Sequence, residues 1–380
     1  MELKEYRFDE VTINFDKKRV PLSGAQREKR QGKYRYYGAQ GVIDHIDDFI
    51  FDGTYLLIAE DGENLKSKKQ KIAQVVEGQF WVNNHAHIVQ GNELCDTRYL
   101  CYLLNSMDLS GYVTGSAQPK LSQANLNAVT LFLPPIFIQK KIVDYLYMFD
   151  KKIAVNQQIN DNLELQAQAF FQELFVDNAD PEWAIGTISD LGAVVGGSTP
   201  SKAKPEYYTE TGIAWITPKD LSINKSKFIS HGENDITELG LKNSSATIMP
   251  EGTVLFSSRA PIGYIAVAAG EVTTNQGFKS IVPKPEIGTA FVYYFLKHNL
   301  PIIEGMASGS TFKEVSGSTM KGVPAVIPDT DTIARFNDFC TPIFAQQRIL
   351  EEQNQSLAVL RDNLLPKLMS GEIDVSTIQL

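Results

Sequence analysis

The chain repeats itself, and this duplication restricts its possible folds more than any other feature. When the sequence is laid over itself with an offset of 194 residues, similar segments align from about residue 115 onward. Residues 115–117 (GSA) then fall on 309–311 (GST), and residues 131–134 (LFLP) fall on 325–328 (AVIP). This repeat is far longer than the roughly 20 to 50 residues of a solenoid repeat. It indicates two copies of one unit, each a mixed domain followed by a helix.

The mixed part of each copy contains strand-like segments. Before residue 115 the offset drifts, as loop insertions would cause, so that 84–86 (NHA) aligns with 275–277 (NQG) and 52–56 (DGTYL) aligns with 251–255 (EGTVL). Residues 49–59 and 253–269 are rich in β-branched and aromatic residues and are interrupted by Gly or Pro, which predicts strands and hairpins. Short helices are predicted at 96–107 and 289–299, where apolar residues recur every three to four positions.

Each copy ends in a long segment with a heptad pattern. Apolar residues follow a 4-3-4-3 spacing over 142–174 and, less regularly, over 336–368, as in the seam of a coiled coil. Each seam carries an asparagine in its middle, Asn160 or Asn354, and a polar residue there fixes the register of the helices at some cost in stability. Two seams in one chain most simply pack on each other, and we expect them to run antiparallel.

The sequence therefore predicts an α+β fold with two similar mixed α/β domains and two long helices packed as an antiparallel coiled coil, related by an internal pseudo-twofold repeat. The expected boundaries are 1–140 for the first domain, 141–180 for the first helix, 181–335 for the second domain and 336–380 for the second helix. A helix over 142–175 would be about 51 Å long, at about 1.5 Å per residue. Such a spacer suits a target that is read in two separated parts.

The composition is that of a globular protein, with 43% hydrophobic and 21% charged residues. No apolar run approaches the roughly 18 residues of a membrane helix, and the first ten residues carry charges where a signal peptide needs an apolar core. Three cysteines without a pairing pattern (Cys95, Cys101 and Cys340) fit a reducing compartment. We expect a soluble cytoplasmic protein with no membrane partner.

The net charge of −9 is unevenly distributed along the chain. The two helical segments hold most of the excess, with three basic and seven acidic residues in 141–180 and three basic and six acidic residues in 336–380. By contrast, residues 17–35 contain eight basic residues and one acidic residue, Glu28. Because local fields govern contact with a polyanion, this stretch is compatible with nucleic-acid binding despite the acidic total.

The sequence motifs of common catalytic sites are missing. Residues 196–200 (GGSTP) lack the lysine and the spacing of a phosphate-binding loop, and no GxGxxG opens a helix. The five histidines are scattered without metal-ligand spacing. The acids Glu60, Asp61 and Glu63 leave a metal-dependent nuclease as an alternative, although a run of acids in an exposed loop is common. We predict no catalytic residue and no metal site in this chain.

A series of short motifs identifies a family resemblance. The first copy contains 33–39 (KYRYYGA), 41–44 (GVID) and 51–62 (FDGTYLLIAEDG), and the C-terminal region reads LLPKLMSGEI over 364–373. The second copy contains five further motifs, which are 197–201 (GSTPS), 215–216 (WI), 244–246 (SSA), 250–259 (PEGTVLFSSR) and 274–276 (TNQ). Through their order, the duplication and the paired helices, the chain resembles the specificity subunits of type I restriction–modification systems along nearly its whole length.

The resemblance implies a non-catalytic reader of double-stranded DNA. Each mixed domain would be a target-recognition domain for one half of a split sequence, and the helices would separate the domains and bind two methyltransferase subunits. Those subunits would carry S-adenosylmethionine and methylate adenine N6, and a restriction subunit would use ATP and Mg, so that this chain itself needs no cofactor. Because the first copy shows no equivalent of Trp215 in the sequence alignment, the two half-sites should differ.

The basic stretch and the glycine-containing loops supply the candidate DNA contacts. Contacts to the DNA backbone are expected from Lys29, Arg30 and Lys33, with Tyr34 and Tyr36 as hydroxyl or stacking groups unless these tyrosines belong to the core. Base-reading candidates are polar residues of the glycine-containing loops in both copies: Gln118, Lys120, Ser122, Ser257, Arg259, Asn275, Gln276, Ser310 and Lys313.

Some of these assignments have structural alternatives. Arg259 either pairs with guanine O6 and N7 or forms a structural ion pair. Asn275 and Gln276, with their aligned counterparts Asn84 and His85, either read bases or fix a turn. On the two helices we expect partner-binding positions at the apolar seam residues Ile153, Leu163, Phe170, Leu174, Leu350, Leu357, Leu364 and Leu368. A different alternative for the whole chain is a freestanding DNA-binding or decoy scaffold without a catalytic partner.

Overall fold

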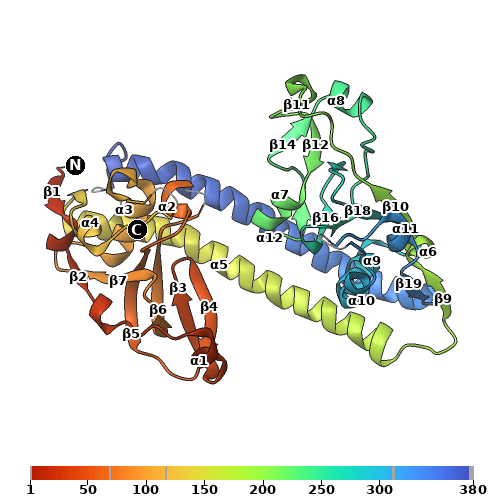
Figure 1. The fold of residues 1–380 in the computed structure, drawn as a ribbon, viewed down its shortest axis with the longest axis horizontal. Coiled ribbons are helices and arrows are strands. Elements are labelled where there is room, and N and C mark those ends of the chain that lie inside the picture. The colour runs from red at the N-terminus through yellow and green to blue at the C-terminus, as the bar shows by residue number, and fades with distance from the viewer. Residues whose placement is uncertain (1, 68–69, 116–117, 310–312, 376–380) are drawn as a thin grey trace. The chain divides into compact units, whose positions relative to one another are not determined.

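The computed structural model describes residues 2–67, 70–115, 118–309 and 313–375. The chain divides into two compact units. Unit 1 comprises Met1–Lys152 and Ser356–Leu380, and unit 2 comprises Ile153–Gln355. The two long helices, α5 (Ile136–Gln172) and α12 (Thr330–Ser370), each contribute one part to each unit (Figure 1).

Unit 1 contains a six-stranded sheet in the order β2-β7-β5-β6-β3-β4 and a two-stranded sheet of β1 and β8. Its strands are β1 (Lys4–Arg7), β2 (Thr12–Asn14), β3 (Gln31–Gly38), β4 (Gly41–Ile46), β5 (Phe51–Ala59), β6 (Ala73–Val82), β7 (Ala86–Gly91) and β8 (Thr130–Leu133). Its short helices are α1 (Gly24–Glu28), α2 (Asn64–Ser67), α3 (Thr97–Ser106) and α4 (Gln123–Asn127).

The core of unit 1 joins the sheet to the long helices through α3. Asp96 caps this helix by accepting hydrogen bonds from the backbone N–H groups of Arg98 and Tyr99. The buried face of α3 packs with Leu56 and Ile58 of β5 and with residues of α5 and α12, including Ile142, Leu146 and Leu368. The helix predicted at 96–107 and the strand predicted within 49–59 are confirmed as α3 and β5.

Unit 2 contains a five-stranded sheet (β10-β18-β15-β16-β13), a four-stranded sheet (β11-β14-β12-β17) and a two-stranded sheet (β19-β9). Its strands are β9 (Ala184–Thr187), β10 (Gly192–Gly196), β11 (Tyr208–Thr209), β12 (Ile213–Ile216), β13 (Phe228–Ile229), β14 (Asn234–Ile236), β15 (Val254–Ser258), β16 (Ile262–Ala268), β17 (Thr273–Thr274), β18 (Lys279–Pro283) and β19 (Pro324–Ile327). Its short helices are α6 (Ile188–Leu191), α7 (Pro218–Ile223), α8 (Glu238–Lys242), α9 (Thr289–His298), α10 (Leu300–Gly305) and α11 (Gly317–Lys321).

The strand pairings confirm that the two units are copies of one fold. In unit 1, β3 pairs with β6 in parallel and β5 pairs with β6 and β7 antiparallel. In unit 2, β12 pairs with β17 in parallel, and β15 pairs with β16 and β18 antiparallel. The long strand β6 thus corresponds to two separate strands, β16 and β17, which is why one sheet of unit 1 becomes two sheets in unit 2.

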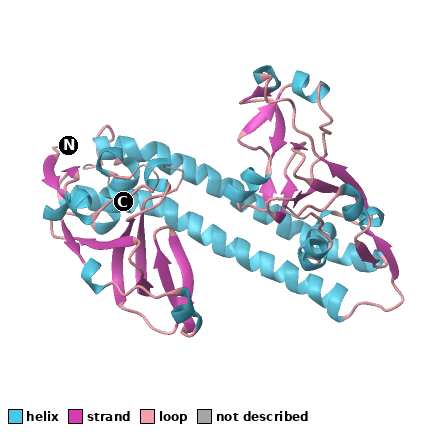
Figure 2. Cartoon of the chain, viewed as in Figure 1, coloured by secondary structure: helices cyan, strands magenta, loops and turns pink. Residues whose placement is uncertain are grey.

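The antiparallel pairing of the long helices is confirmed within each unit. In unit 2 the Asn156 amide donates a hydrogen bond of 2.9 Å to Asn354 Oδ1, and Asn160 Nδ2 lies 3.4 Å from the Gln347 carbonyl. In unit 1, Arg361 Nη1 lies 2.5 Å from Asp150 Oδ1. The two long helices therefore run in opposite directions within each unit. Figure 2 draws them as the two longest cyan helices.

The long helices begin slightly earlier than the expected boundaries at 141 and 336. α5 follows directly after Pro134 and Pro135, since proline ends the preceding strand but is tolerated at a helix start. Asp329 accepts a hydrogen bond of 2.8 Å from the backbone N–H of Thr332 and so caps the start of α12. Within the described ranges of the chain, no helix has the length and apolar character needed to cross a membrane.

Candidate nucleic-acid interface

Three chain segments meet beyond the end of β5 in unit 1. Glu60 donates its backbone N–H to the carbonyl of His85, at 2.9 Å, and accepts from the N–H of Leu121, at 2.8 Å. Thr114 and Lys120 exchange two backbone hydrogen bonds of 2.8 Å. We call the residues joined in this way, 60–61, 83–85, 114 and 120–121, the loop frame of unit 1.

The same bonds recur beyond the end of β15 in unit 2. Ser258 donates to the carbonyl of Gly277 at 2.7 Å and accepts from Val315 at 3.0 Å, while Ser308 and Glu314 exchange bonds of 3.1 and 2.9 Å. The loop frame of unit 2 therefore consists of residues 258–259, 275–277, 308 and 314–315. Position 60 corresponds to 258, position 61 to 259, and position 120 to 314.

An asparagine bends the middle segment of each frame. Asn83 donates its N–H to Tyr37 and its side-chain oxygen accepts from the N–H of His85 at 2.8 Å. Asn275 donates its N–H to Ile216 and its side-chain oxygen accepts from the N–H of Gly277 at 2.9 Å. The turn-fixing alternative holds for Asn275, but the sequence alignment with Asn84 was wrong by one residue, because the true counterpart is Asn83.

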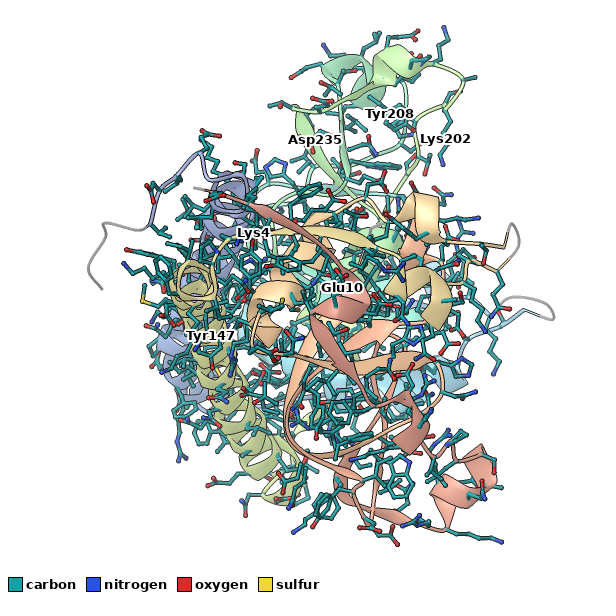
Figure 3. All side chains as sticks on the ribbon, turned by 90° about the vertical axis from the view of Figure 1, so that its left-hand side faces the viewer. Lys4, Glu10, Tyr147, Lys202, Tyr208 and Asp235 are labelled. Atoms are coloured by element: carbon teal, nitrogen blue, oxygen red, sulfur yellow. The ribbon has the colours of Figure 1, made fainter. Side chains whose placement is uncertain are left out.

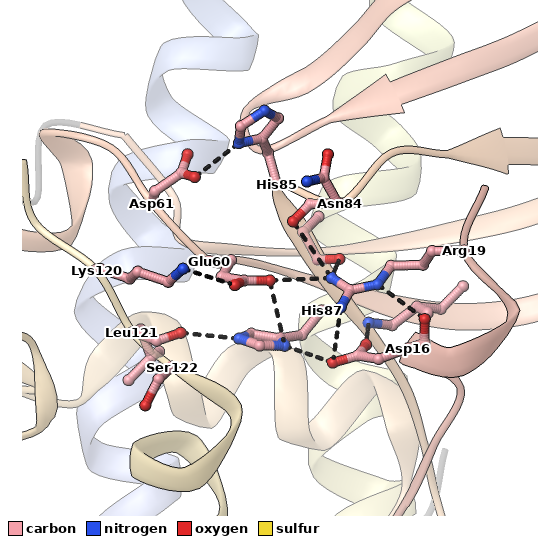
Figure 4. Close-up of polar contacts among 12 residues, drawn as sticks. Asp16, Arg19, Glu60, Asp61, Asn84, His85, His87, Lys120, Leu121 and Ser122 are labelled. Carbon is pink, nitrogen blue, oxygen red and sulfur yellow. Dashed lines mark hydrogen bonds and ion pairs between the residues drawn. The ribbon is translucent and has the colours of Figure 1, made fainter. Parts of the chain in front are cut away.

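A buried polar network supports the frame of unit 1 from below (Figure 4). His87 is buried, with Nδ1 2.7 Å from Asp16 Oδ2 and Nε2 2.8 Å from the Leu121 carbonyl oxygen. Both ring nitrogens therefore lie within hydrogen-bond distance of an oxygen atom, one on Asp16 and one on the Leu121 carbonyl. Burial opposes the charge of Asp16, but hydrogen bonds from His87 and from the N–H of Ile88 hold the pKa of Asp16 below its usual value.

The acids of the unit 1 frame have basic side chains of the same chain as partners. Glu60 lies 3.0 Å from Arg19 Nη1 and 3.3 Å from Lys120 Nζ. Asp61 lies 2.7 Å from Nδ1 of His85. Figure 4 shows these pairs around the strand end. Arg19 and Lys120 therefore neutralise Glu60, one of the acids of the nuclease alternative. Over the described ranges of the chain, no group of three or more His, Cys, Asp and Glu is placed to hold a metal ion.

In the frame of unit 2 the carboxylate is that of Glu314, at the position of Lys120. Its oxygens lie 3.6 Å from Arg259 Nη1 and 3.6 Å from Lys279 Nζ. Arg259 also lines a cleft of about 460 Å³ together with Lys202, Lys219 and Gln276. Lys202 lies with Tyr208 and Asp235 in the part of unit 2 built on β11 and β14 (Figure 3). The cleft thus opens beside the frame and carries several donors.

The predicted base-reading residues separate into exposed and structural groups. The side chains of Gln118, Lys120, Gln276 and Lys313 are exposed, and Arg259 is half-buried. Gln276 accepts a hydrogen bond from Thr199 Oγ1. Three of the remaining predicted residues stabilise the local fold: Ser122 caps α4, Ser257 is buried and bonded to the turn at Pro261 and Tyr264, and Asn275 bends the frame. Ser310 lies outside the described residues.

In the fold, acidic residues from outside the basic stretch 17–35 offset part of its positive charge. Arg27 lies 2.9 Å from Asp44 and Arg30 lies 2.8 Å from Asp47, so acids from β4 and the following turn neutralise both. Lys29 and Lys33 are exposed. Because Arg30 precedes β3 whereas Tyr37 near its end bonds to the frame, Arg30 lies roughly 20 Å and Lys33 roughly 13 Å from the frame along the strand.

The two predicted tyrosines have different surroundings. Tyr34 is half-buried against Phe49, with Lys33 Nζ 5.0 Å from its ring centre. Tyr36 is fully buried, and its hydroxyl accepts from the N–H of Leu22 at 2.9 Å. The core alternative therefore holds for Tyr36, and we leave it out of the proposed surface.

The expected lack of a Trp215 counterpart was also wrong. Tyr36 pairs with Trp81 in the parallel ladder where Trp215 pairs with Thr273. Both aromatic side chains bond to the backbone of the segment that precedes their strand. The Tyr36 hydroxyl accepts from the N–H of Leu22, and Trp215 Nε1 donates to the Ser198 carbonyl at 3.0 Å. An alignment that matches letters does not find this pair, since the two residue types differ.

The predicted partner-binding residues of the helices lie inside the units. Leu174, Leu350 and Leu368 are buried, and the others are partly buried: Ile153, Leu163, Phe170, Leu357 and Leu364. The fold therefore covers these side chains wholly or in part. The exposed apolar residues of the helices lie elsewhere, with Met148, Val359 and Leu360 in unit 1 and Leu165 and Ile349 in unit 2.

Sequence reasoning missed the residues that complete each frame. Asn83, Glu314 and Lys279 were not predicted, and Arg19 was counted only within the basic stretch. The 194-residue offset places Glu314 opposite Lys120, so the repeat contained a signal for the exchanged charge at this position. Lys279 and Arg19 become visible only in space, since they reach the frame from β18 and from the segment before α1.

Comparison with known proteins gives matches along both units. A family model for the type I restriction modification DNA specificity domain matches residues 2–165 and again 181–358. The MjaIX specificity subunit of Methanocaldococcus jannaschii is 39% identical over 191 residues, which cover 48% of this chain and 44% of that subunit. The HindI specificity subunit of Haemophilus influenzae is 24% identical, over 85% of this chain and 84% of that subunit.

A solved structure has the same fold. The crystal structure of the type I restriction–modification S subunit from M. genitalium aligns with a TM-score of 0.59 at 16% identity, over 97% of this chain and 96% of that chain. The agreement covers both mixed parts and the long helices.

Proposed function

The chain belongs to the type I restriction–modification DNA specificity family, and from this we propose that it reads a split, asymmetric sequence in double-stranded DNA, with each unit reading one half. Specificity subunits are the non-catalytic DNA-recognition components of a restriction–modification complex. The split target and the division of labour between the units are our inference.

The duplicated loop frame is the observation that carries this proposal. Both frames share the backbone bonds, the bending asparagine, and a serine cap at Ser122 or Ser316. The outward side chains differ, since Asp61 corresponds to Arg259 and Lys120 corresponds to Glu314. A common scaffold with different polar groups is what two different half-sequences require.

Contacts to the DNA backbone would come mainly from exposed lysines. Lys29 and Lys33 of unit 1 and Lys313 of unit 2 are exposed, and a contact between a lysine and a phosphate carries no sequence information. Arg30 contributes less, because Asp47 already offsets its charge. Tyr34 is positioned beside Lys33 and adds a hydroxyl group to this surface.

We further propose that the long helices hold methyltransferase subunits, two per chain, and that a restriction subunit joins the complex. The relatives are named as subunits of type I restriction enzymes, which supports such an assembly. The exposed apolar residues of the helices, among them Met148 and Leu165, offer a surface for protein partners. The acidic helical segments would be repelled by phosphate, which also favours protein over DNA there.

The cofactors of the complex would belong to those partners. S-adenosylmethionine would serve adenine methylation in the methyltransferase subunits, and ATP with Mg would serve the restriction subunit. Such a complex would act on DNA in the cytoplasm.

The test is a map of N6-methyladenine in DNA from cells that express this chain with its methyltransferase, compared with cells that lack the chain. Methylation confined to a split motif, and only when the chain is present, is the expected result. An unchanged map together with failure of the two proteins to co-purify would instead leave a freestanding DNA-binding scaffold.

A further inference from the structure

Each loop frame carries an ion pair between the segment at the strand end and the opposite segment, and the cation lies on a different segment in the two frames. In unit 1 the acid Glu60 lies at the strand end and its partner Lys120 lies on the opposite segment, 3.3 Å away. In unit 2 the cation Arg259 lies at the strand end and its partner Glu314 lies on the opposite segment, 3.6 Å away. Residues 61 and 259 make the equivalent backbone bridge, to 120 and 314 respectively.

Each carboxylate lies between one inner cation and one outer cation. Glu60 lies between Arg19, whose side chain is 15% exposed, and Lys120, which is 54% exposed. Glu314 lies between Lys279, which is 15% exposed, and Arg259, which is 38% exposed. The two units therefore build the same arrangement from positions that are not equivalent.

This geometry favours base edges over phosphates as the target of the outer cations. A carboxylate within 3.3 to 3.6 Å offsets much of the attraction between the cation and a phosphate. It also restricts a long side chain to few conformations, which a directed hydrogen bond requires. Arg and Lys donate to guanine O6 and N7 in the major groove.

We propose that Lys120 and Arg259 are the specificity-determining cations of units 1 and 2, that each reads a guanine, and that Glu60 and Glu314 are the positioning residues that hold them. This inference rests on the proposed function. Because the cation comes from opposite sides of the two frames, the guanine lies at a different place in each half-site.

The experiment maps N6-methyladenine for variants of the full chain, co-expressed with the methyltransferase. Arg259→Ala should reduce the preference for guanine about tenfold to a hundredfold at one position of one half-site, and leave the other half-site unchanged. Glu314→Gln should weaken the same position, and Glu314→Asp should restore it, because aspartate keeps the charge beside Arg259. Glu60→Gln should act in the same way on the other half-site.

The charge-exchange double variant Arg259→Glu/Glu314→Arg separates reading from structure. It keeps an ion pair in the frame but moves the cation to the opposite segment, as in unit 1. The original guanine preference should therefore be lost while methylation guided by the other half-site remains. Recovery of the original motif would mark the pair as structural only and overturn the proposal, as would an equal loss at every sequence.

A matched control and the unaltered chain complete the design. The exposed pair Glu238 and Lys242 on α8 lies outside the frame, and its exchange (Glu238→Lys/Lys242→Glu) should leave the motif as it is. Failure of the proposed function is distinguishable, because the unaltered chain would then direct no methylation to a split motif. Co-purification of each variant with the methyltransferase reports that it has folded.

Discussion

Asn83 and Asn275 bend the two frames in the same way, because each side-chain oxygen accepts the backbone N–H two residues later. Asn83 is buried, whereas the neighbouring Asn84 is exposed. We expect Asn83→Ala to lower the free energy of unfolding by about 1–2 kcal/mol, since it leaves the His85 N–H without its acceptor. Asn84→Ala should change it by less than about 0.5 kcal/mol. Urea denaturation of the three chains measures the difference.

Equal effects of the two substitutions would contradict the register of the frame. The sequence alone favoured the wrong residue because two asparagines are adjacent, and the letters NHA match NQG at least as well as the true segment does. Only the bonds from Asn83 to Tyr37 and from Asn275 to Ile216 decide between them. A shift of one residue in a strand moves every side chain to the other face, so such an error matters for any site.

The exposed lysines and the paired arginine of the basic stretch should differ in salt dependence. Lys29→Ala and Lys33→Ala should each flatten the slope of log K against log salt by about one if the lysine contacts a phosphate. Arg30→Ala should leave the slope nearly unchanged, because Asp47 already neutralises the arginine. DNA binding measured at several salt concentrations distinguishes them. If Arg30→Ala flattened the slope and neither lysine variant did, the two lysines would not contact the DNA backbone.

The density of positive charge was thus only partly predictable from the sequence. Counting residues 17–35 finds the lysines but not the acids that the fold brings to them, since Asp44, Asp47 and Glu60 lie beyond that stretch. The net charge around a side chain depends on which strands pair beside it, and a count of charged residues along one stretch of sequence does not include that information.

At the scale of elements, a buried ion cluster ties the long helices to the mixed part of unit 2. Glu164 of α5 contacts Lys227, and it lies 2.6 Å from Lys297 of α9. Burial opposes its charge, but the two lysines lower the pKa of Glu164 to about 2. Burial lowers the pKa of Lys227, which offsets part of the gain. The cluster therefore contributes stability through the ionised form of Glu164.

We expect Glu164→Gln to destabilise the chain by about 2–3 kcal/mol at pH 7, since the pKa lies about two units below the usual glutamate value. The folded-state pKa is depressed, so this contribution is complete above about pH 4.3 and disappears as the pH falls toward 2. Urea denaturation of both chains at pH 7 and pH 3 provides the measurement. A gap between the two chains that is equally large at both pH values would show that Glu164 acts through packing rather than charge.

Elements with a local signal were predictable, and those that depend on the other chain segments were not. The heptad pattern predicted α5 and α12, and apolar periodicity predicted α3 and α9, because each helix buries its own stripe of residues. The division of one long strand into β16 and β17 was not predictable, since pairing partners set where a strand ends. The candidate partner-binding residues were chosen from the apolar seam, and the two long helices pack on each other through that seam.

At the scale of the whole molecule, the repeat allows one copy to replace the other at matched positions. Lys4 pairs with Leu133 as Ala184 pairs with Ile327, so residues 184–328 can be exchanged for residues 4–134 without changing the register at the joins. If each unit reads one half-site, the resulting chain should direct methylation to a motif that contains the first half-sequence twice.

The reciprocal exchange is the matched control for this prediction. Replacing residues 4–134 by 184–328 should give a motif with the second half-sequence twice, and the two half-sequences must together be those of the unaltered chain. Both chimaeras keep the helices that we propose to hold the methyltransferase, so both should co-purify with it. A chimaera that co-purifies with the methyltransferase yet still directs methylation to the original asymmetric motif would contradict this division of the half-sites between the units. The original motif would then be recognised although one of the two units is absent from the chimaera.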